Sequence, residues 1–384
     1  MKGLIVFFIV FILVYVLLNV YICLRGASLL PKITWLKATY FTAYIILAGS
    51  YIIGRALLGI IPDALSNALM FIGAYWFAFM VFFLFAFLLI DIIRLVHHFT
   101  GFVPNIILNN MNYIKPIAAA VIMLGITITV IAGRINADNV IVKTVPVTIE
   151  KKTQGLSSLK VVLISDIHLG LMVQRDELSH IVELSNKEEP DIVLLCGDIF
   201  DERVEPVKAF NAKELLSAFK SKYGTFAVTG NHEYIGTADA AVEYLRESGI
   251  IVLRDESILI ANSFYVSGRD DFSSESRSGV KRLPLEEIVA KLDKTKPIIL
   301  MDHQPKDLNI TAACNIDLQV SGHTHAGQLW PWSMLVNAAW EVPYGYAKKE
   351  KSQIYVTSGA GTWGPRVRIG TTPEIVVMNI DFIK

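Results

Sequence analysis

Hydrophobic residues are distributed very differently in the two parts of the chain. Four long apolar runs lie within the first 134 residues, at 3–24, about 36–54, 64–90 and 117–132. The first run, "GLIVFFIVFILVYVLLNVYICL", holds no charged residue, and a bilayer crossing needs about 20 apolar residues. Residues 1–134 are therefore predicted to form an α-helical membrane domain with about four transmembrane helices.

Two other interpretations of these runs are weaker. A soluble helix bundle does not need four such runs in so short a stretch. A cleavable signal peptide has a shorter apolar region than the first run, and no clear Ala-x-Ala site follows it. Asp91 and Arg94, three residues apart at the end of the third run, indicate an interfacial ion pair rather than a transport pathway.

From about residue 139 onward, short apolar segments alternate with amphipathic ones. Residues 139–150 alternate like an edge strand, in which Pro146 is tolerated. Strands are expected at 160–166, 191–198 and 224–231, and they alternate with helices at 175–188, 206–221 and 238–248. Further strands are expected at 250–255, 257–261, 264–270, 297–303, 317–323, 353–359 and 374–380. Residues 139–384 are therefore predicted to form an α/β domain, a two-sheet β-sandwich flanked by helices.

The charge distribution supports a boundary near residue 135. Residues 1–134 hold eight Lys or Arg and two acidic residues, which leaves 27 of the 35 basic and 33 of the 35 acidic residues for the rest. The formal net charge of zero therefore combines a half near +6 with a half near −6. The three cysteines provide neither a disulfide framework nor a Cys-x-x-Cys zinc pattern.

Basic residues near the apolar runs bear on membrane orientation. The connections after the first and third runs carry five of them and the opposite side carries four: Arg25, Lys32, Lys37, Arg94 and Lys115 against Lys2, Arg55, Arg134 and Lys143. Because basic residues are enriched in cytoplasmic loops, we expect both ends of the chain on the extracytoplasmic side.

Polar side chains with metal-binding chemistry stand at the carboxyl ends of the predicted strands. Ligands of α/β sheets bind at this edge, so side chains far apart in sequence should converge there. Five of the eight histidines take part. The full set is Asp166, His168, Asp198, Asn231, His232, His303, His323 and His325.

The donor types narrow the choice of metal. Nitrogen and oxygen donors without thiolate favour Mn, Fe or Zn over Mg or Ca. Eight such side chains exceed the needs of one tetrahedral site, whereas two divalent ions bridged by a carboxylate would use seven of them. Two-metal sites of this kind act on phosphoesters by binding the attacking and leaving oxygens.

The segments "DIH" (166–168), "GD" (197–198), "GNHE" (230–233), His303 and "GHTH" (322–325) resemble the motif series of the calcineurin-like metallophosphoesterases. The order matches throughout, and the resemblance covers roughly residues 140–384. Two segments, "GLSSLKVVLISDIHLG" and "SGHTHAGQ", are similar to bacterial membrane-associated phosphoesterases of the YkuE and YaeI type. The family usually has a glycine where this chain has Ala326, a departure that removes no ligand.

The resemblance implies a role for each of these residues. Asp198 would bridge the two ions, and a bridging hydroxide would attack phosphorus in line. His232 would stabilise phosphoryl oxygens or protonate the leaving group. The remaining ligands would divide into Asp166, His168 and His325 for the first ion and Asn231, His303 and His323 for the second.

Two further segments carry candidate substrate contacts. The glycine-rich "GAGTWG" (359–364) is followed by Pro365 rather than a helix, which favours a loop beside the metal site over dinucleotide binding. Arg366 and Arg368 in this region could contact a phosphate, although solvated surface arginines are the simpler interpretation. In "LWPWSMLVNAAW" (329–340), Trp330 is either part of a packed loop or part of an apolar lip facing the bilayer or a lipid chain.

These observations predict an integral membrane protein of a bacterial cell membrane, with a catalytic domain close to the membrane surface. The expected activity is hydrolysis of a phosphoester, on a lipid-linked or amphiphilic substrate, with two divalent metal ions as cofactors. Cleavage of a nucleotide-sugar lipid pyrophosphate is the alternative reaction, and a non-catalytic membrane sensor or scaffold is the alternative class. The expected partners are the lipid bilayer and the substrate, not nucleic acid, and the sequence leaves the oligomeric state open.

Overall fold

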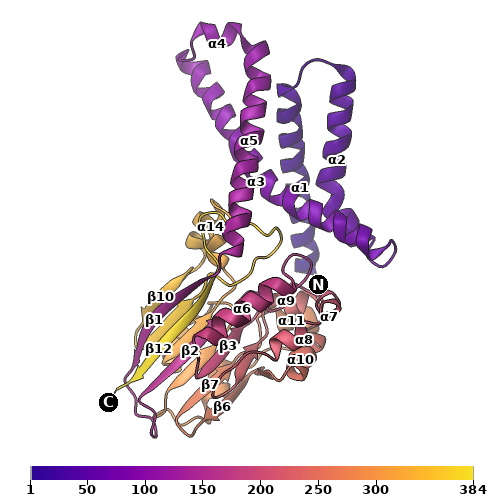
Figure 1. Cartoon of the computed structure of the whole chain (residues 1–384). Coiled ribbons are helices and arrows are strands. Elements are labelled where there is room, and N and C mark those ends of the chain that lie inside the picture. The colour runs from indigo at the N-terminus through magenta and orange to yellow at the C-terminus, as the bar shows by residue number, and fades with distance from the viewer. Residues whose placement is uncertain (1, 384) are drawn as a thin grey trace. The chain divides into compact units, whose positions relative to one another are not determined.

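The computed structural model of the chain describes residues 2–383, with side chains from residue 9 onward. It divides into two compact units, Met1–Gly133 and Arg134–Lys384. The predicted fold class is confirmed: apolar helices are followed by an α/β unit with two mixed sheets (Figure 1).

Four helices of the described chain are long and apolar enough to cross a membrane. They are α1 (Lys2–Leu29), α2 (Thr34–Ala56), α3 (Asp63–Thr100) and α5 (Met111–Asp138), with the short α4 (Asn105–Asn109) before the last. Each extends beyond the apolar run that predicted it. At about 1.5 Å per residue, the 38 residues of α3 reach well beyond a hydrocarbon core of about 30 Å.

Polar side chains and small residues hold α1, α2 and α3 together. Asn19 Oδ1 of α1 accepts hydrogen bonds from Tyr44 of α2 at 3.1 Å and from Trp76 of α3 at 3.0 Å. A side chain at Gly73 would collide with the backbone of Tyr51, so glycine lets α2 and α3 approach closely.

The predicted Asp91–Arg94 pair is part of a larger cluster near the end of α3. Arg94 Nη1 is 3.7 Å from Asp91 Oδ1, and Arg25 Nη2 of α1 is 2.6 Å from Asp91 Oδ2. Tyr21 donates a hydrogen bond to the same oxygen at 2.8 Å. The carboxylate is thus neutralised by local partners, as the interfacial interpretation requires.

The second unit contains two six-stranded sheets that pack face to face (Figure 1). The first has the order β1-β12-β2-β3-β4-β5, and the second β10-β11-β9-β8-β7-β6. The strands of the first sheet are β1 (Ile141–Ile149), β12 (Glu374–Phe382), β2 (Ser158–Ile164), β3 (Ile192–Cys196), β4 (Thr225–Val228) and β5 (Ile251–Val252). Those of the second are β10 (Gly345–Lys349), β11 (Ser352–Val356), β9 (Leu318–Ser321), β8 (Ile298–Met301), β7 (Phe264–Gly268) and β6 (Glu256–Ile260).

The main core lies between the two sheets, where alternate residues of β2, β3 and β4 meet residues of β7, β8 and β9. A second apolar cluster covers the outer face of the first sheet beneath α6 (Arg175–Lys187), α7 (Glu205–Ala209), α8 (Ala212–Leu216) and α10 (Ala238–Glu247). On the outer face of the second sheet lie α12 (Leu285–Val289) and α13 (Leu308–Ala313). Four layers therefore hold the strand ends in fixed positions.

Some predicted elements differ from the observed ones. The single helix expected over 206–221 is two short helices, because Asn211 between α7 and α8 adopts a left-handed conformation with φ 55°. Strand β10 and the helices α9 (Asn231–Ile235), α11 (Ser273–Ser278), α12, α13 and α14 (Trp332–Ala339) were not predicted from the sequence.

Candidate metal centre

The parallel strands of both sheets bring the predicted ligands to one place. Asp166 and His168 follow β2, Asp198 follows β3, and Asn231 begins α9 just after β4. These three strands are parallel neighbours in the first sheet, and β8 and β9 are parallel neighbours in the second. His303 follows β8, and His323 and His325 follow β9. The two sheets thus contribute opposite sides of one cluster.

Local backbone conformation directs these side chains inward. Five of the seven predicted ligands have positive φ angles between 49° and 71°: Asp166, His168, Asp198, His323 and His325. A left-handed residue other than glycine costs roughly 1–2 kcal/mol and is found mainly where surrounding structure enforces it. Such strain concentrated at one sheet edge is typical of a functional site.

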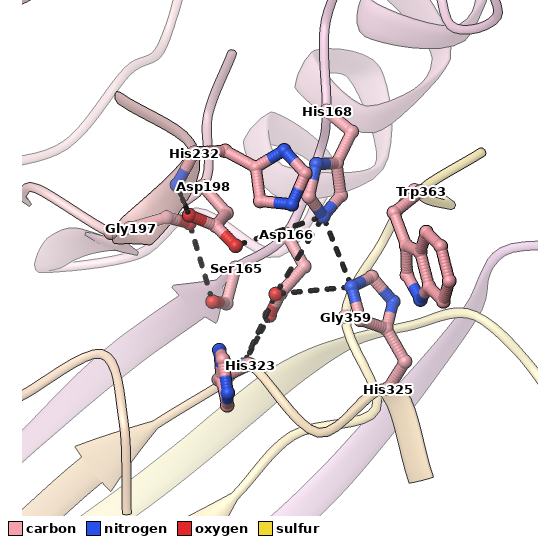
Figure 2. A network of polar contacts seen from close by, with 12 residues as sticks. Ser165, Asp166, His168, Gly197, Asp198, His232, His323, His325, Gly359 and Trp363 are labelled. Atoms are coloured by element: carbon pink, nitrogen blue, oxygen red, sulfur yellow. Dashed lines mark hydrogen bonds and ion pairs between the residues drawn. The ribbon is translucent and has the colours of Figure 1, made fainter. Parts of the chain in front are cut away.

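The first donor group contains the carboxylate of Asp166 and the imidazoles of His168 and His325 (Figure 2). Asp166 Oδ1 is 3.2 Å from His325 Nε2 and 3.9 Å from His168 Nε2. The two Nε2 atoms are 3.0 Å apart. All three side chains are buried.

The second donor group contains Asp198, His303 and His323, whose ligand atoms lie within 4.8 Å of one another. His303 Nε2 is 3.0 Å from Asp198 Oδ2, and His323 Nδ1 is 2.7 Å from Asn231 Oδ1. Asp198 Oδ2 is also 3.9 Å from His168 Nε2 of the first group. Asp198 therefore stands between the two groups.

The donors fit a pair of divalent cations. Nε2 of His303 is buried. It has no hydrogen-bond partner among the described residues, although it lies close to Asp198 Oδ2. The Nε2 atoms of His168 and His325 face each other, and both lie near the carboxylate of Asp166. The nearby thiol of Cys196 lies in the core between the sheets instead. Imidazole nitrogens with carboxylate and amide oxygens suit Mn, Fe or Zn.

The protonation states of four donors favour metal binding, whereas His303 differs: burial would lower its pKa, but the carboxylate of Asp198 raises it, so a metal ion would have to displace a proton there. Burial would raise the pKa values of Asp166 and Asp198, but the facing histidines outweigh it and hold both pKa values below the usual range. Burial lowers the pKa of His323 to about 3 and that of His325 to about 4. Both imidazoles are therefore neutral near pH 7 and keep a lone pair available for a metal ion.

His232 has a different character from the ligands. Burial would lower its pKa, but the carboxylates of Asp198 and Asp201 raise it to about 10. Its ring lies 4.5 Å from the ring of His168, and its backbone N–H donates to Asp198 Oδ1 at 2.8 Å. A protonated imidazole at the edge of the cluster can donate a proton or bind a phosphoryl oxygen.

Two acidic residues beyond the predicted set support the cluster. Asp201 Oδ1 lies 3.6 Å from His168 Nδ1 and 3.4 Å from His232 Nδ1. The sequence marked Asp201 as an acidic residue three positions after Asp198. Glu233 accepts backbone hydrogen bonds from Gly230, Asp198 and Phe200 at 2.7, 3.1 and 2.9 Å.

The two candidate arginines are engaged within the protein. Arg368 is fully buried, and its Nη2 donates to the carbonyls of Ser358, Gly359 and Gly361 at 2.6, 3.1 and 2.7 Å. The same atom is 3.3 Å from His325 Nδ1. The expectation of solvated surface arginines is therefore wrong for Arg368, because the loop carbonyls need a buried donor.

Arg366 pairs with the carboxylates of Glu177 and Asp138, and its side chain is largely buried. Trp330, the third candidate substrate contact, is half-exposed, and its backbone N–H donates to the carbonyl of Ile369 at 2.7 Å.

The glycine-rich segment 359–364 packs against the first donor group. A side chain at Gly359, where φ is 80°, would lie 2.7 Å from Asp166 Cβ, and one at Gly361 would collide with the carbonyl of Ile167. The N–H of Gly361 donates to the carbonyl of Asp166 at 2.8 Å. These glycines permit close backbone approach, which agrees with a loop beside the metal site.

Comparisons with known proteins agree with this geometry. A family model described as calcineurin-like phosphoesterase matches residues 159–327. A metallophosphoesterase of Aquifex aeolicus is 31% identical over 234 residues, which cover 60% of this chain and 88% of that protein. One of Helicobacter pylori strain J99 is 35% identical over 248 residues, 62% of this chain and 63% of that protein. The chain belongs to the calcineurin-like metallophosphoesterase family.

A further relative is named as a transmembrane protein. The "transmembrane protein with metallophosphoesterase domain" of Danio rerio is 34% identical over 243 residues, 60% of this chain and 55% of that protein. The matching region spans less than two thirds of the Helicobacter pylori and Danio rerio relatives. Together with the four apolar helices, this relative supports a membrane protein.

Proposed function

We propose that this protein is a membrane-anchored, dinuclear-metal phosphohydrolase. The observation that carries the proposal is the position of Asp198, 3.0 Å from His303 on one side and 3.9 Å from His168 on the other. Asp166, His168 and His325 would hold one divalent ion, and Asn231, His303 and His323 the other, with Asp198 shared. Bound ions supply a hydroxide nucleophile at neutral pH and neutralise charge on the phosphoryl group.

The protein's own residues supply the remaining steps. Protonated His232 donates its proton to the leaving oxygen or stabilises the phosphoryl oxygens during in-line attack. Asp201 keeps the imidazole of His232 oriented, since its backbone carbonyl makes a hydrogen bond with Nδ1 of His232 and its carboxylate lies 3.4 Å from the same atom. Arg368 contacts Nδ1 of His325. A direct phosphate contact by Arg366 or Arg368 would require that side chain to leave its present partners.

A lipid-linked or amphiphilic phosphoester is the proposed substrate class. The support is the short connection between α5, which ends at Asp138, and β1, which begins at Ile141. A domain tethered so closely to an apolar helix samples substrates at the membrane. The proposed location is a bacterial cell membrane with the catalytic unit on the extracytoplasmic side, and Trp330 is proposed to contact the apolar part of the substrate.

An experiment and an observation distinguish this proposal from two alternatives. Cleavage of a nucleotide-sugar lipid pyrophosphate needs the same metal centre and is tested with UDP-diacylglucosamine against simple phosphodiesters. A non-catalytic scaffold is the other alternative. It is disfavoured because all seven predicted ligands are present and converge.

The purified full chain with Mn should hydrolyse bis-(p-nitrophenyl) phosphate or the corresponding monoester. Asp198→Ala should abolish turnover because it removes the donor shared by both ions. Asp176→Ala, which changes an exposed carboxylate on α6, serves as the matched control and should turn over like the wild type. Equal rates for the Asp198 and Asp176 variants would refute the assignment.

A further inference from the structure

A short helix with exposed apolar side chains lies next to the metal centre. Helix α14 has the sequence WSMLVNAA, and none of its eight residues is buried within the described chain. Trp332, Met334 and Leu335 are 44%, 65% and 59% exposed. Trp363, in the loop after β11, is 48% exposed. We call these four residues the α14 surface. A helix of this composition in a soluble domain normally buries an apolar face.

The α14 surface is joined rigidly to the metal centre. Trp340, directly after α14, packs its ring 5.1 Å from the ring of His323. Gln328, four residues before α14, donates to the carbonyl of Trp363 at 2.9 Å and accepts from its N–H at 3.1 Å. Whatever covers the α14 surface therefore lies close to the metal centre.

The same surface is joined to the end of the last apolar helix. Asn136, in the last turn of α5, donates to the carbonyls of Arg368 at 3.0 Å and Thr371 at 2.7 Å. Between these two residues, the N–H of Ile369 donates to the carbonyl of Gln328 at 2.9 Å. The apolar run 117–132 ends four residues before Asn136, so few residues separate this hydrogen-bonded segment from the last apolar run.

We propose that the α14 surface docks into the interfacial layer of the lipid bilayer. Tryptophan is enriched in this layer, and an amphipathic helix there buries its apolar side chains about 5–10 Å deep. Helix α14 carries no charged residue that would oppose insertion. Docking places the metal centre level with the lipid headgroups. The inference concerns a surface rather than a reaction, so its test does not depend on the proposed activity.

Site-directed spin labelling of the full chain in lipid nanodiscs tests the proposal. A nitroxide is attached at Leu335→Cys or Met334→Cys, and its collision rates with molecular oxygen and with a water-soluble nickel chelate are measured. The matched control is Lys291→Cys, an exposed position between α12 and β8, at the opposite ends of the strands. The described native cysteines are buried, and unsubstituted protein measures background labelling.

We expect the oxygen-to-nickel accessibility ratio at positions 334 and 335 to be several-fold higher than at 291. The addition of Trp332→Ser should lower the ratio at 335 and leave the ratio at 291 unchanged. High nickel accessibility at 334 and 335 would show that the surface is in water and would overturn the proposal. Low accessibility to both reagents would show a protein cover, such as a second copy of the chain, and would overturn it as well.

Discussion

Asp201 is a single carboxylate that faces two imidazoles of the metal centre. Its Oδ1 lies 3.6 Å from Nδ1 of His168 and 3.4 Å from Nδ1 of His232. A carboxylate at Nδ1 fixes the tautomer and the ring orientation, so that Nε2 is presented to the metal ion. The same group therefore supports one proposed ligand and the proposed proton donor.

Asp201→Asn should lower metal affinity or turnover by about 10- to 100-fold, because partners of this kind are typically worth that much. The measurement is a Mn titration of phosphodiester hydrolysis that separates kcat from the metal midpoint. Asp176→Asn on the exposed face of α6 is the matched control. If both parameters of the Asp201 variant equalled those of this control, the carboxylate would have no positioning role.

At the scale of single elements, the turn after β9 contains a residue in an unfavourable conformation. Ala326 has φ 49° and ψ 25°, and it lies between the ligand His325 and Gly327. A side chain in this region costs roughly 1–2 kcal/mol, whereas glycine has no such penalty but loses more chain entropy on folding. The turn therefore stores strain directly beside a proposed ligand.

Ala326→Gly should stabilise the second unit by roughly 1 kcal/mol, since relief of the side-chain clash exceeds the entropic cost of glycine. Thermal unfolding followed by circular dichroism in detergent is the measurement. The control is Ala240→Gly within α10, where the same substitution should destabilise by roughly 1 kcal/mol. A shift of the same sign in both variants would contradict the strain argument.

The elements whose position could be predicted are those with a strong apolar pattern. Strands β2, β3 and β4 are continuous apolar runs that end in Asp166, Asp198 and Asn231, so their neighbouring ends implied convergence. Helix α14 and strand β10 were missed because both are short: α14 has eight residues, and β10 has five, two of which are lysines. Segments of this length carry too little of the periodic pattern from which helices and strands are predicted.

The supporting residues of the site could not be predicted for another reason. Arg368 contacts His325 only because the loop 358–361 folds over its guanidinium and supplies three carbonyl acceptors. Burial lowers the pKa of Arg368 to about 10, so the side chain stays charged near pH 7. Such an arrangement depends on tertiary packing and leaves no signature in the sequence around residue 368.

At the scale of the whole molecule, metal binding should contribute to the stability of the second unit. Its donors come from both sheets, and ions that bind only the folded state stabilise it by about 2.7 kcal/mol at a concentration of 100 Kd. Removal of metal with EDTA should lower the midpoint of thermal unfolding. Asp198→Ala should show little response to EDTA, because its metal centre is already disrupted. An equal EDTA response in both proteins would place the effect elsewhere.

The expected membrane orientation rests on a small difference in positive charge. Five basic residues flank the connections after the first and third apolar runs, against four on the opposite side, so the catalytic unit should be extracytoplasmic. Alkaline phosphatase fused at the C-terminus should then be active, and a fusion in the connection between α1 and α2 should be inactive.

Because the margin is one charge, the orientation should be reversible. Lys32→Gln together with Lys37→Gln reduces five to three, which reverses the bias and should lower the activity of the C-terminal fusion. Lys220→Gln with Lys222→Gln removes two charges far from the apolar runs and is the matched control. If the first pair left the fusion activity at the level of the control, loop charge would not determine the side on which the metal centre works.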